Sequence, residues 1–319
     1  MSALPELSAI RDAQSLLANY FPPTPLVKAS SLSRADAEVF LKVETGLPTG
    51  SFKPRGALCA LAKKLRQQEV KEVIASSTGN HGAAVAFAAK TLGVPATIFL
   101  PEGANPVKRK KIEELGARIV CQGSVDLAAA SQAAREYARQ PGIYFLNDAT
   151  DPDLIAGPAT IGVELTEQLR DLSAVYVPMG DTALIRGIGS ALKQLAPKVQ
   201  VIGVQAERAP SYVLSWRAGA PTPTETCDTC ADGLATRTPE AENVAAIRRV
   251  VDDVFLVSED QMIDAVRHLF REENTLAEPS GAATTAAFIA NPMPGRIALL
   301  VTGANIGDEV RVRAGIQLP

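Results

Sequence analysis

The chain has 319 residues, with 32 Lys and Arg against 35 Asp and Glu, which gives a formal net charge of −3. Because binding to phosphate backbones needs a basic surface, this balance argues against nucleic acid as a principal partner. A hydrophobic share of 46% with 21% charged residues is typical of a globular protein of about one or two domains.

Targeting signals and cysteines bear on the compartment. No stretch approaches the roughly 18 consecutive apolar residues of a membrane span, and residues 1–19 lack the basic start and apolar run of a secretory signal. The four cysteines are too few for a disulfide framework in a chain of this length. Cys227 and Cys230 have the spacing of a zinc pair, but no second pair completes the site, so two unrelated thiols are favoured. We expect a cytoplasmic protein without a membrane partner.

Short apolar, β-branched runs alternate along the chain with alanine-rich amphipathic stretches, a pattern typical of βαβ units and a mostly parallel sheet. The predicted strands are 39–43, 73–76, 96–100, 118–120, 144–146, 174–178, 201–204 and 297–301. The predicted helices are 57–68, 82–92, 106–115, 125–139, 156–169, 184–195, 259–273 and 280–290. Residues 217–245 show no clear period, and such long loops commonly carry function or form a plain surface excursion.

Four segments beside these elements combine small residues with polar ones: 49–57, 76–82, 178–187 and 302–305. Junctions between a strand and a helix present backbone N–H groups to anions. Each segment alone is a weak signal, and for 76–82 an ordinary helix N-cap is an equal alternative. Because ligands bind in the crevice at the carboxyl ends of the strands in an open α/β sheet, we expect the four segments to converge.

Three side chains in these segments invite chemistry. Lys53 precedes a predicted helix, and lysine forms Schiff bases with carbonyl groups; a helix N-terminus and Arg55 would help to lower its pKa. By local pattern alone, an exposed lysine is the commoner interpretation. Arg186 is either a phosphate partner or, slightly favoured, an exposed helix residue. His81 and His268 are the only histidines, which excludes a multi-histidine metal site, and His268 is expected to be structural.

Taken together and in this order, the segments resemble the fold type II pyridoxal 5′-phosphate enzymes, and among them the threonine and serine dehydratases most closely. Serine racemase, threonine synthase and cysteine synthase belong to the same group. The resemblance runs from Pro22 to Asn305 and implies a tryptophan synthase β-like α/β fold, with two open, mostly parallel sheets and the cofactor in the cleft between them. It also implies a large domain of residues 1–49 and 148–319, a small domain of residues 50–147, and a homodimer.

The resemblance further implies roles for single residues. Lys53, which would carry the cofactor, and Thr78 are the expected catalytic residues. The expected cofactor-binding residues are Lys53, Phe52, Asn80, Gly180, Asp181, Thr182, Ala183, Leu184 and Thr302. The expected binding residues for the substrate carboxylate are Ser77, Thr78, Gly79, Asn80 and His81. Thr302 would face the pyridine nitrogen, and a neutral hydroxyl there makes the ring a weaker electron sink, which favours β-elimination.

Several positions depart from the family pattern. Asp181 lies where dehydratases have a run of glycines, and its charge near a phosphate is costly unless it points away, pairs with Arg186 or meets a protonated phosphate. Gln205 replaces the metal-binding glutamate of some members, so no catalytic metal is expected. Thr78 replaces the serine of serine racemase, which makes racemisation less favoured. Pro158 and Ala159 replace an amide-bearing loop and could accommodate a bulkier substrate.

These observations predict a dehydratase that converts a β-hydroxy-α-amino acid to a 2-oxo acid and ammonia. The substrate is serine, threonine or a larger amino acid such as 3-phenylserine. The alternatives are a threonine-synthase-like or cysteine-synthase-like replacement enzyme, an amino-acid racemase, and a degenerate protein that binds pyridoxal phosphate or an amino acid without catalysis. The end of the chain soon after Thr302 predicts no amino-acid-sensing domain.

Overall fold

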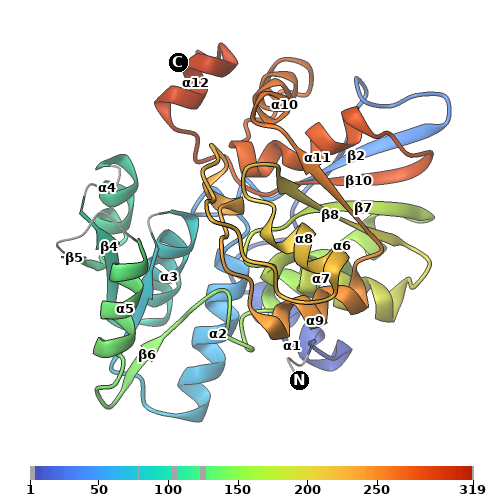
Figure 1. The fold of residues 1–319 in the computed structure, drawn as a ribbon. Coiled ribbons are helices and arrows are strands. Elements are labelled where there is room, and N and C mark those ends of the chain that lie inside the picture. Colours follow the sequence, from blue (N-terminus) through green and yellow to red (C-terminus); the bar gives the residue numbers. More distant parts are fainter. Residues whose placement is uncertain (1–3, 78, 103–105, 123–126, 318–319) are drawn as a thin grey trace.

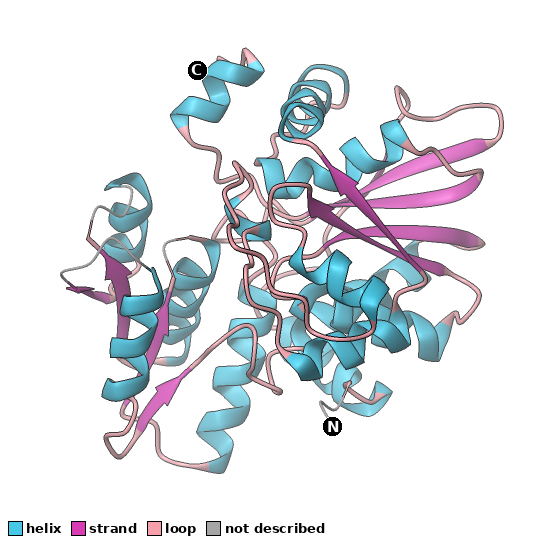
Figure 2. Cartoon of the chain, in the orientation of Figure 1, coloured by secondary structure: helices cyan, strands magenta, loops and turns pink. Residues whose placement is uncertain are grey.

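The computed structural model describes residues 4–77, 79–102, 106–122 and 127–317. The strands are β1 (Leu26–Lys28), β2 (Ala37–Val43), β3 (Glu72–Ser76), β4 (Ala96–Pro101), β5 (Arg118–Gln122), β6 (Ile143–Phe145), β7 (Leu172–Pro178), β8 (Gln200–Ala206), β9 (Asp253–Val257) and β10 (Gly295–Val301). They form two separate sheets (Figure 2).

The helices lie mostly between successive strands, as expected for βαβ units. They are α1 (Leu7–Leu17), α2 (Pro54–Gln67), α3 (Asn80–Leu92), α4 (Pro106–Glu114), α5 (Leu127–Tyr137), α6 (Ala156–Gln168), α7 (Ala183–Leu195), α8 (Ser211–Ala218), α9 (Ala241–Val250), α10 (Glu259–Glu272), α11 (Pro279–Ala290) and α12 (Asp308–Ala314). A short 3₁₀ turn, η1, covers Asp232–Leu234.

The larger sheet has the strand order β1-β2-β10-β7-β8-β9, and every pair in it is parallel except β1 with β2. Helices α10 and α11 pack on one face, and α6, α7 and α9 on the other (Figure 1). The central strands are therefore buried on both faces, which explains their continuous apolar sequences, such as Ala298–Val301.

The smaller sheet has the order β5-β4-β3-β6 and is parallel throughout. Helices α2 and α3 pack with β3 and β4 in one core, and α5 packs on the opposite face. Figure 1 shows this sheet, in cyan and green, beside the larger one. The predicted fold class, with two open and mostly parallel sheets, is confirmed.

All eight predicted strands are present, with ends shifted by up to two residues. The eight predicted helices are also present, although residues 125–126 of one lie outside the described residues. Strands β1 and β9 were not predicted. The aperiodic stretch 217–245 was interpreted wrongly in part, since η1 and the start of α9 lie within it.

None of the helices among the described residues is long and apolar enough to cross a bilayer. Cys59, Cys121, Cys227 and Cys230 are all free thiols. His268 on α10 hydrogen-bonds with Ser31 Oγ at 2.7 Å, which is the structural role expected of it.

Candidate active site

One cavity of about 200 Å³ brings together residues from all four sequence segments. The first contributes Lys53, the second Asn80, the third Asp181 and the fourth Thr302. Beside them the cavity is lined by Phe52, Ser76, Ser77, Gly79, His81, Asp148, Pro178, Gly180, Thr182, Ala183, Leu184, Asp232, Gly233, Leu234, Ala235, Thr236, Glu278 and Ser280. The predicted convergence at strand ends is therefore observed.

Backbone hydrogen bonds tie the first segment to the fourth. Phe52 N donates to Thr302 O at 3.0 Å, and Ala304 N donates to Gly50 O at 2.9 Å. Gly50 has a φ of 72°, and a Cβ there would lie 3.0 Å from Asn305 Oδ1, so only glycine suits this approach. These bonds fix the loop that carries Lys53 against the end of β10.

Lys53 is the last residue before α2, and Pro54 at the first helical position supplies the backbone angle that a helix start needs. Its Nζ lies 2.5 Å from Asp148 Oδ2, and its side chain is 20% exposed. Burial opposes the charge of Lys53, but Asp148, assisted by Asp181 and Glu278, outweighs it and raises the pKa of the lysine. The expectation of a lowered pKa was wrong, because Arg55 points away from the cavity into a separate network.

Asp148 and His81 extend this cluster. His81 Nε2 donates to Leu146 O at 2.9 Å, and its Nδ1 lies 3.8 Å from Asp148 Oδ2. Burial lowers the pKa of His81, although the charge of Asp148 acts in the opposite direction. Burial also opposes ionisation of Asp148, yet His81 and Lys53 together lower its pKa. Lys53 and Asp148 thus form the charged pair, and His81 stands beside it.

The amino end of α7 and the residues just before it form another part of the cavity wall. Thr182 adopts a φ of 68° just before the helix, and a Cβ on Gly180 would lie 2.1 Å from Gly233 O. Arg186 follows on the first turn and is 2% exposed, so its interpretation as an exposed residue was wrong. Its Nη2 donates to Ala149 O at 3.1 Å.

Two buried donors at this helix end have no partner among the residues that the structure describes: Thr182 Oγ1 and Arg186 Nε. Buried polar groups are almost always hydrogen-bonded, so two buried donors without partners beside a cavity indicate that a ligand binds there. The backbone N–H groups at a helix N-terminus are themselves an anion site. This end of the cavity therefore fits a phosphate.

Asn80, the first residue of α3, lies at the centre of a small amide network. Its Nδ2 donates to Glu278 Oε1 at 2.6 Å, and its Oδ1 accepts from Asn305 Nδ2 at 2.6 Å. Ser77 Oγ accepts from Gly79 N at 3.2 Å and so tightens the turn into the helix. The network fixes Asn80 at the cavity wall, beside the carboxyl end of β3.

All the predicted site residues line the cavity except Thr78, which lies outside the described residues. Sequence reasoning missed Asp148, Glu278 and the segment 232–236. Asp148 follows the end of β6, so the strand-end rule that selected the other segments could have found it. The segment 232–236 lies in the aperiodic stretch already singled out as a loop of possible function, and its Gly233 packs against Gly180.

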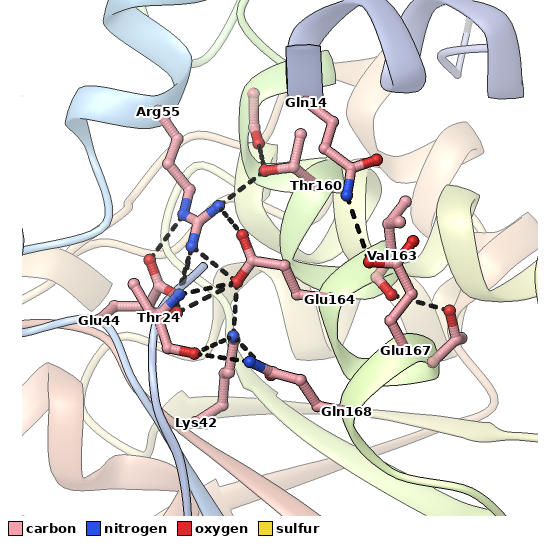
Figure 3. A network of polar contacts seen from close by, with 12 residues as sticks. Gln14, Thr24, Lys42, Glu44, Arg55, Thr160, Val163, Glu164, Glu167 and Gln168 are labelled. Carbon is pink, nitrogen blue, oxygen red and sulfur yellow. Dashed lines mark hydrogen bonds and ion pairs between the residues drawn. The ribbon is translucent and has the colours of Figure 1, made fainter. Parts of the chain in front are cut away.

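A second charge cluster, which we call the Arg55 network, is buried and contributes no residue to the lining of the cavity. Figure 3 shows this network. Arg55 donates to Glu44 and to Glu164, with Nε to Glu44 Oε2 at 2.8 Å and Nη1 to Glu164 Oε1 at 2.6 Å. Lys42 Nζ donates to Glu164 Oε2 at 2.5 Å. Thr24 and Thr160 also accept from Arg55. The network joins α2 of the smaller sheet's layer to β2 and α6 of the larger one.

Gln205, which takes the place of a metal-binding glutamate, is buried on β8. Its Oε1 accepts from the backbone N–H groups of Tyr212 and Val213 at 3.1 and 3.0 Å. Across residues 4–77, 79–102, 106–122 and 127–317, no group of three or more His, Cys, Asp or Glu side chains is arranged to hold a metal ion.

A lysine, a helix end suited to phosphate and polar walls in a cleft of an α/β fold define the class of enzyme that carries an aldehyde cofactor on a lysine. The model of the family described as pyridoxal-phosphate dependent enzyme matches residues 17–303. The chain belongs to this family.

Curated relatives and solved structures agree with this assignment. The chain is 36% identical to an L-threonine ammonia-lyase of Thermotoga maritima over 94% of its length and 75% of the relative's. It is 32% identical to the L-threonine dehydratase catabolic TdcB of Staphylococcus aureus, covering 98% of this chain and 92% of that one. The structure of the processed form of threonine deaminase isoform 2 from Solanum lycopersicum has a TM-score of 0.89 at 29% identity and covers 97% of this chain and 88% of that one.

Proposed function

We propose that the protein is a pyridoxal-phosphate dependent threonine dehydratase, an ammonia-lyase that converts L-threonine to a 2-oxo acid and ammonia. The observation that carries the proposal is the convergence of four segments on one cavity around Lys53. Relatives at 32 to 36% identity over nearly the whole chain are named threonine ammonia-lyase or dehydratase, which supports threonine as the substrate.

The cavity residues divide into three groups toward the cofactor. Lys53 Nζ would carry it covalently, and the amino end of α7, from Gly180 to Leu184, would bind its phosphate. Phe52 and Asn80 would lie beside the ring, and the hydroxyl of Thr302 would face the pyridine nitrogen. Pyridoxal phosphate supplies an electron sink that stabilises negative charge at the substrate Cα.

Lys53 also moves the protons of the elimination. Its Nζ is the base that would take the proton from Cα of the bound substrate. The bond from Cβ to the hydroxyl then breaks, and the hydroxyl leaves as water with a proton that Lys53 Nζ can supply. The enamine product is released and hydrolyses to the 2-oxo acid and ammonia.

The substrate carboxylate would bind the turn that leads into α3. The residues that would bind it are Ser77, Gly79, Asn80 and His81, together with Thr78, which lies outside the described residues. Asn80 and His81 are the first two residues of α3, where backbone N–H groups favour an anion. Asp148 holds Lys53 Nζ in position at 2.5 Å.

We further propose that residues 50–147 form the small domain and residues 1–49 and 148–319 the large one. The four strands of the smaller sheet all lie between Glu72 and Phe145, which supports this division. A homodimer located in the cytoplasm stays a prediction, and sedimentation of the purified protein tests the dimer.

The test is a substrate panel with purified protein and added pyridoxal phosphate. L-Threonine, L-serine and DL-threo-3-phenylserine are supplied in turn, and 2-oxo acid is measured. We expect L-threonine to give the fastest release. Conversion of L-serine to D-serine without 2-oxo acid would indicate a racemase, and product only from phosphorylated or acetylated substrates a replacement enzyme. Visible absorbance that never responds to any amino acid would identify a protein that only binds.

A further inference from the structure

Asp181 is the one acidic residue among Gly180 to Leu184, the segment that would bind the cofactor phosphate. It lines the cavity directly before α7, a helix of 13 residues. Its neighbours Thr182 and Arg186 each keep a buried donor without a partner in the described part of the chain. An anion is therefore expected here, although an ionised Asp181 would repel it.

The groups that face Asp181 come from five elements. Lys53 lies before α2, Asp148 follows β6, Arg186 lies on α7 and Tyr212 on α8. From the loop after η1, Thr236 Oγ1 donates to Asp181 Oδ1 at 3.3 Å. The remaining titratable residues of the same cavity are His81, Asp232 and Glu278.

The environment of Asp181 disfavours the ionised form of its carboxyl group. Burial comes first and the charge of Asp148 second, and together they raise the pKa of Asp181 to about 6, although Lys53, Thr236 and Arg186 act in the opposite direction. Lys53 is already paired with Asp148. A phosphate dianion close to Asp181 raises its pKa further, since like charges disfavour ionisation.

We propose that Asp181 binds the cofactor phosphate as a neutral carboxylic acid. One proton from solvent is taken up by the Asp181 carboxylate as the cofactor enters, and the acid donates it in a hydrogen bond to a phosphate oxygen. The inference rests on the proposed function only in that it needs pyridoxal phosphate in this cavity. It holds whatever amino acid the enzyme consumes.

Proton uptake makes cofactor affinity depend on pH in a way that a glycine at this position would not. Above pH 6 the free carboxylate must first be protonated, so affinity falls by about tenfold for each further pH unit, relative to a variant that cannot ionise at position 181. At pH 8 the difference reaches about 100-fold.

The experiment is calorimetric titration of the cofactor-free protein at pH 8 in two buffers of different ionisation enthalpy, which counts the protons taken up. The ligand is pyridoxal phosphate. A parallel titration with pyridoxal, which lacks the phosphate, counts the protons that Lys53 releases on binding the aldehyde, and this count is subtracted. We expect the wild type to take up close to one proton more than Asp181→Asn. The matched control is Asp151→Asn. Asp151 is a half-buried carboxyl of raised pKa that does not line the cavity, and we expect this variant to behave as the wild type.

Asp181→Ala separates the charge from the donated hydrogen bond. It should lose the extra proton as Asp181→Asn does, but bind pyridoxal phosphate more weakly than Asp181→Asn. Phosphorus NMR of the bound cofactor locates the proton, and we expect the same dianion signal in the wild type and in Asp181→Asn at pH 8. Thermal unfolding of each cofactor-free variant confirms that it is folded.

Three results would overturn the inference: equal proton uptake by the wild type and Asp181→Asn, a monoanion phosphorus signal in the wild type alone, or weaker binding by Asp181→Asn at every pH. If the wild type binds no pyridoxal phosphate in any of these titrations, the proposed function fails instead, and the two failures are thus distinguished.

Discussion

Lys53 and Arg55 are two positions apart in the sequence, but they belong to different charge clusters. Lys53 lies in the cavity and Arg55 lies in the Arg55 network. In the network every charge has a counter-charge: Arg55 meets Glu44 and Glu164, and Lys42 meets Glu164. At the cavity, Thr182 Oγ1 and His81 Nδ1 have no hydrogen-bond partner among the described residues, and the same holds for Arg186 Nε behind the cavity wall. The Arg55 network is complete without a ligand, and the cluster around Lys53 is not.

This difference distinguishes a cluster that stabilises the fold from a cluster that can bind a ligand. A buried ion pair with all its hydrogen bonds made holds the fold in register but offers nothing to a ligand. A cluster with unpaired buried groups and shifted pKa values is the usual mark of a binding or catalytic site. The four predictions below test that contrast, in order of decreasing expected effect.

The largest effect is expected from Lys53→Ala. Removal of the residue that we propose carries the cofactor should lower kcat/KM for 2-oxo acid formation by about 10⁴-fold or more. The control is Lys63→Ala on the same helix, where the lysine is 55% exposed and pairs with Asp153 outside the cavity. That variant should keep activity within about twofold. Comparable losses in the two variants would refute the assignment of Lys53.

Arg55→Ala should show the opposite profile, with stability lost first. It leaves Glu44 and Glu164 buried without their main partner, which costs about 3 to 5 kcal/mol in the free energy of unfolding. Arg11→Ala breaks an ion pair with Glu167 in which both side chains are nearly half exposed, and should cost less than about 1 kcal/mol. Denaturant titration measures both, and similar values would show that the network is not special.

Asp181→Asn should stabilise the cofactor-free protein. Because the folded state raises the pKa of Asp181 to about 6, an ionised carboxylate lowers stability progressively from about pH 4 to pH 6, and the full cost persists above that range. At pH 7 the variant should gain up to about 3 kcal/mol, and at pH 4 the gain should vanish. Urea unfolding at the two pH values measures it. A loss of stability at pH 7 would mean that the carboxylate is favourably bound.

Asp148→Asn should act through Lys53. Without the carboxylate 2.5 Å away, the pKa of Lys53 falls, so the free amine that captures pyridoxal phosphate exists at lower pH. We expect the pH midpoint of cofactor capture to move down by about one unit or more. Asp153→Asn, whose carboxylate pairs with Lys63 instead, should leave the midpoint unchanged. An upward shift in Asp148→Asn would reverse the assigned role.

The fold could be predicted from the sequence because the parallel strands are continuous apolar runs separated by alanine-rich helices. Lys53 became a candidate because it lies in a glycine-containing segment before a predicted helix, but its role as the cofactor-carrying lysine came from the family resemblance, since the local pattern alone favours an exposed lysine. Asp148 was missed although a strand was predicted at 144–146, because the residues 147–151 after it contain no glycine, unlike the four segments that were selected. Thr236 and its neighbours were missed because they reach the cavity by tertiary packing of Gly233 on Gly180, which leaves no local pattern.

The orientation of arginines was the weakest part of the prediction, and the reason is physical. Helix α7 is buried from Ala183 to Leu192, because α6 and α9 cover the face that the sheet does not. Arg186 therefore has no exposed side to turn to. Arg55, expected beside Lys53, pairs instead with Glu44, which directly follows β2, and with Glu164, which lies far along the chain on α6. Neither environment can be read from neighbouring residues in the sequence.

The most direct test is to add pyridoxal phosphate to the purified protein, reduce it with borohydride to fix the cofactor on its lysine, and map the labelled peptide. We predict one labelled lysine per chain, Lys53, no label on Lys42 of the Arg55 network, and loss of the label in Lys53→Ala. A label on another lysine, or an unchanged label in Lys53→Ala, would contradict the claim that the incompletely paired cluster is the active site.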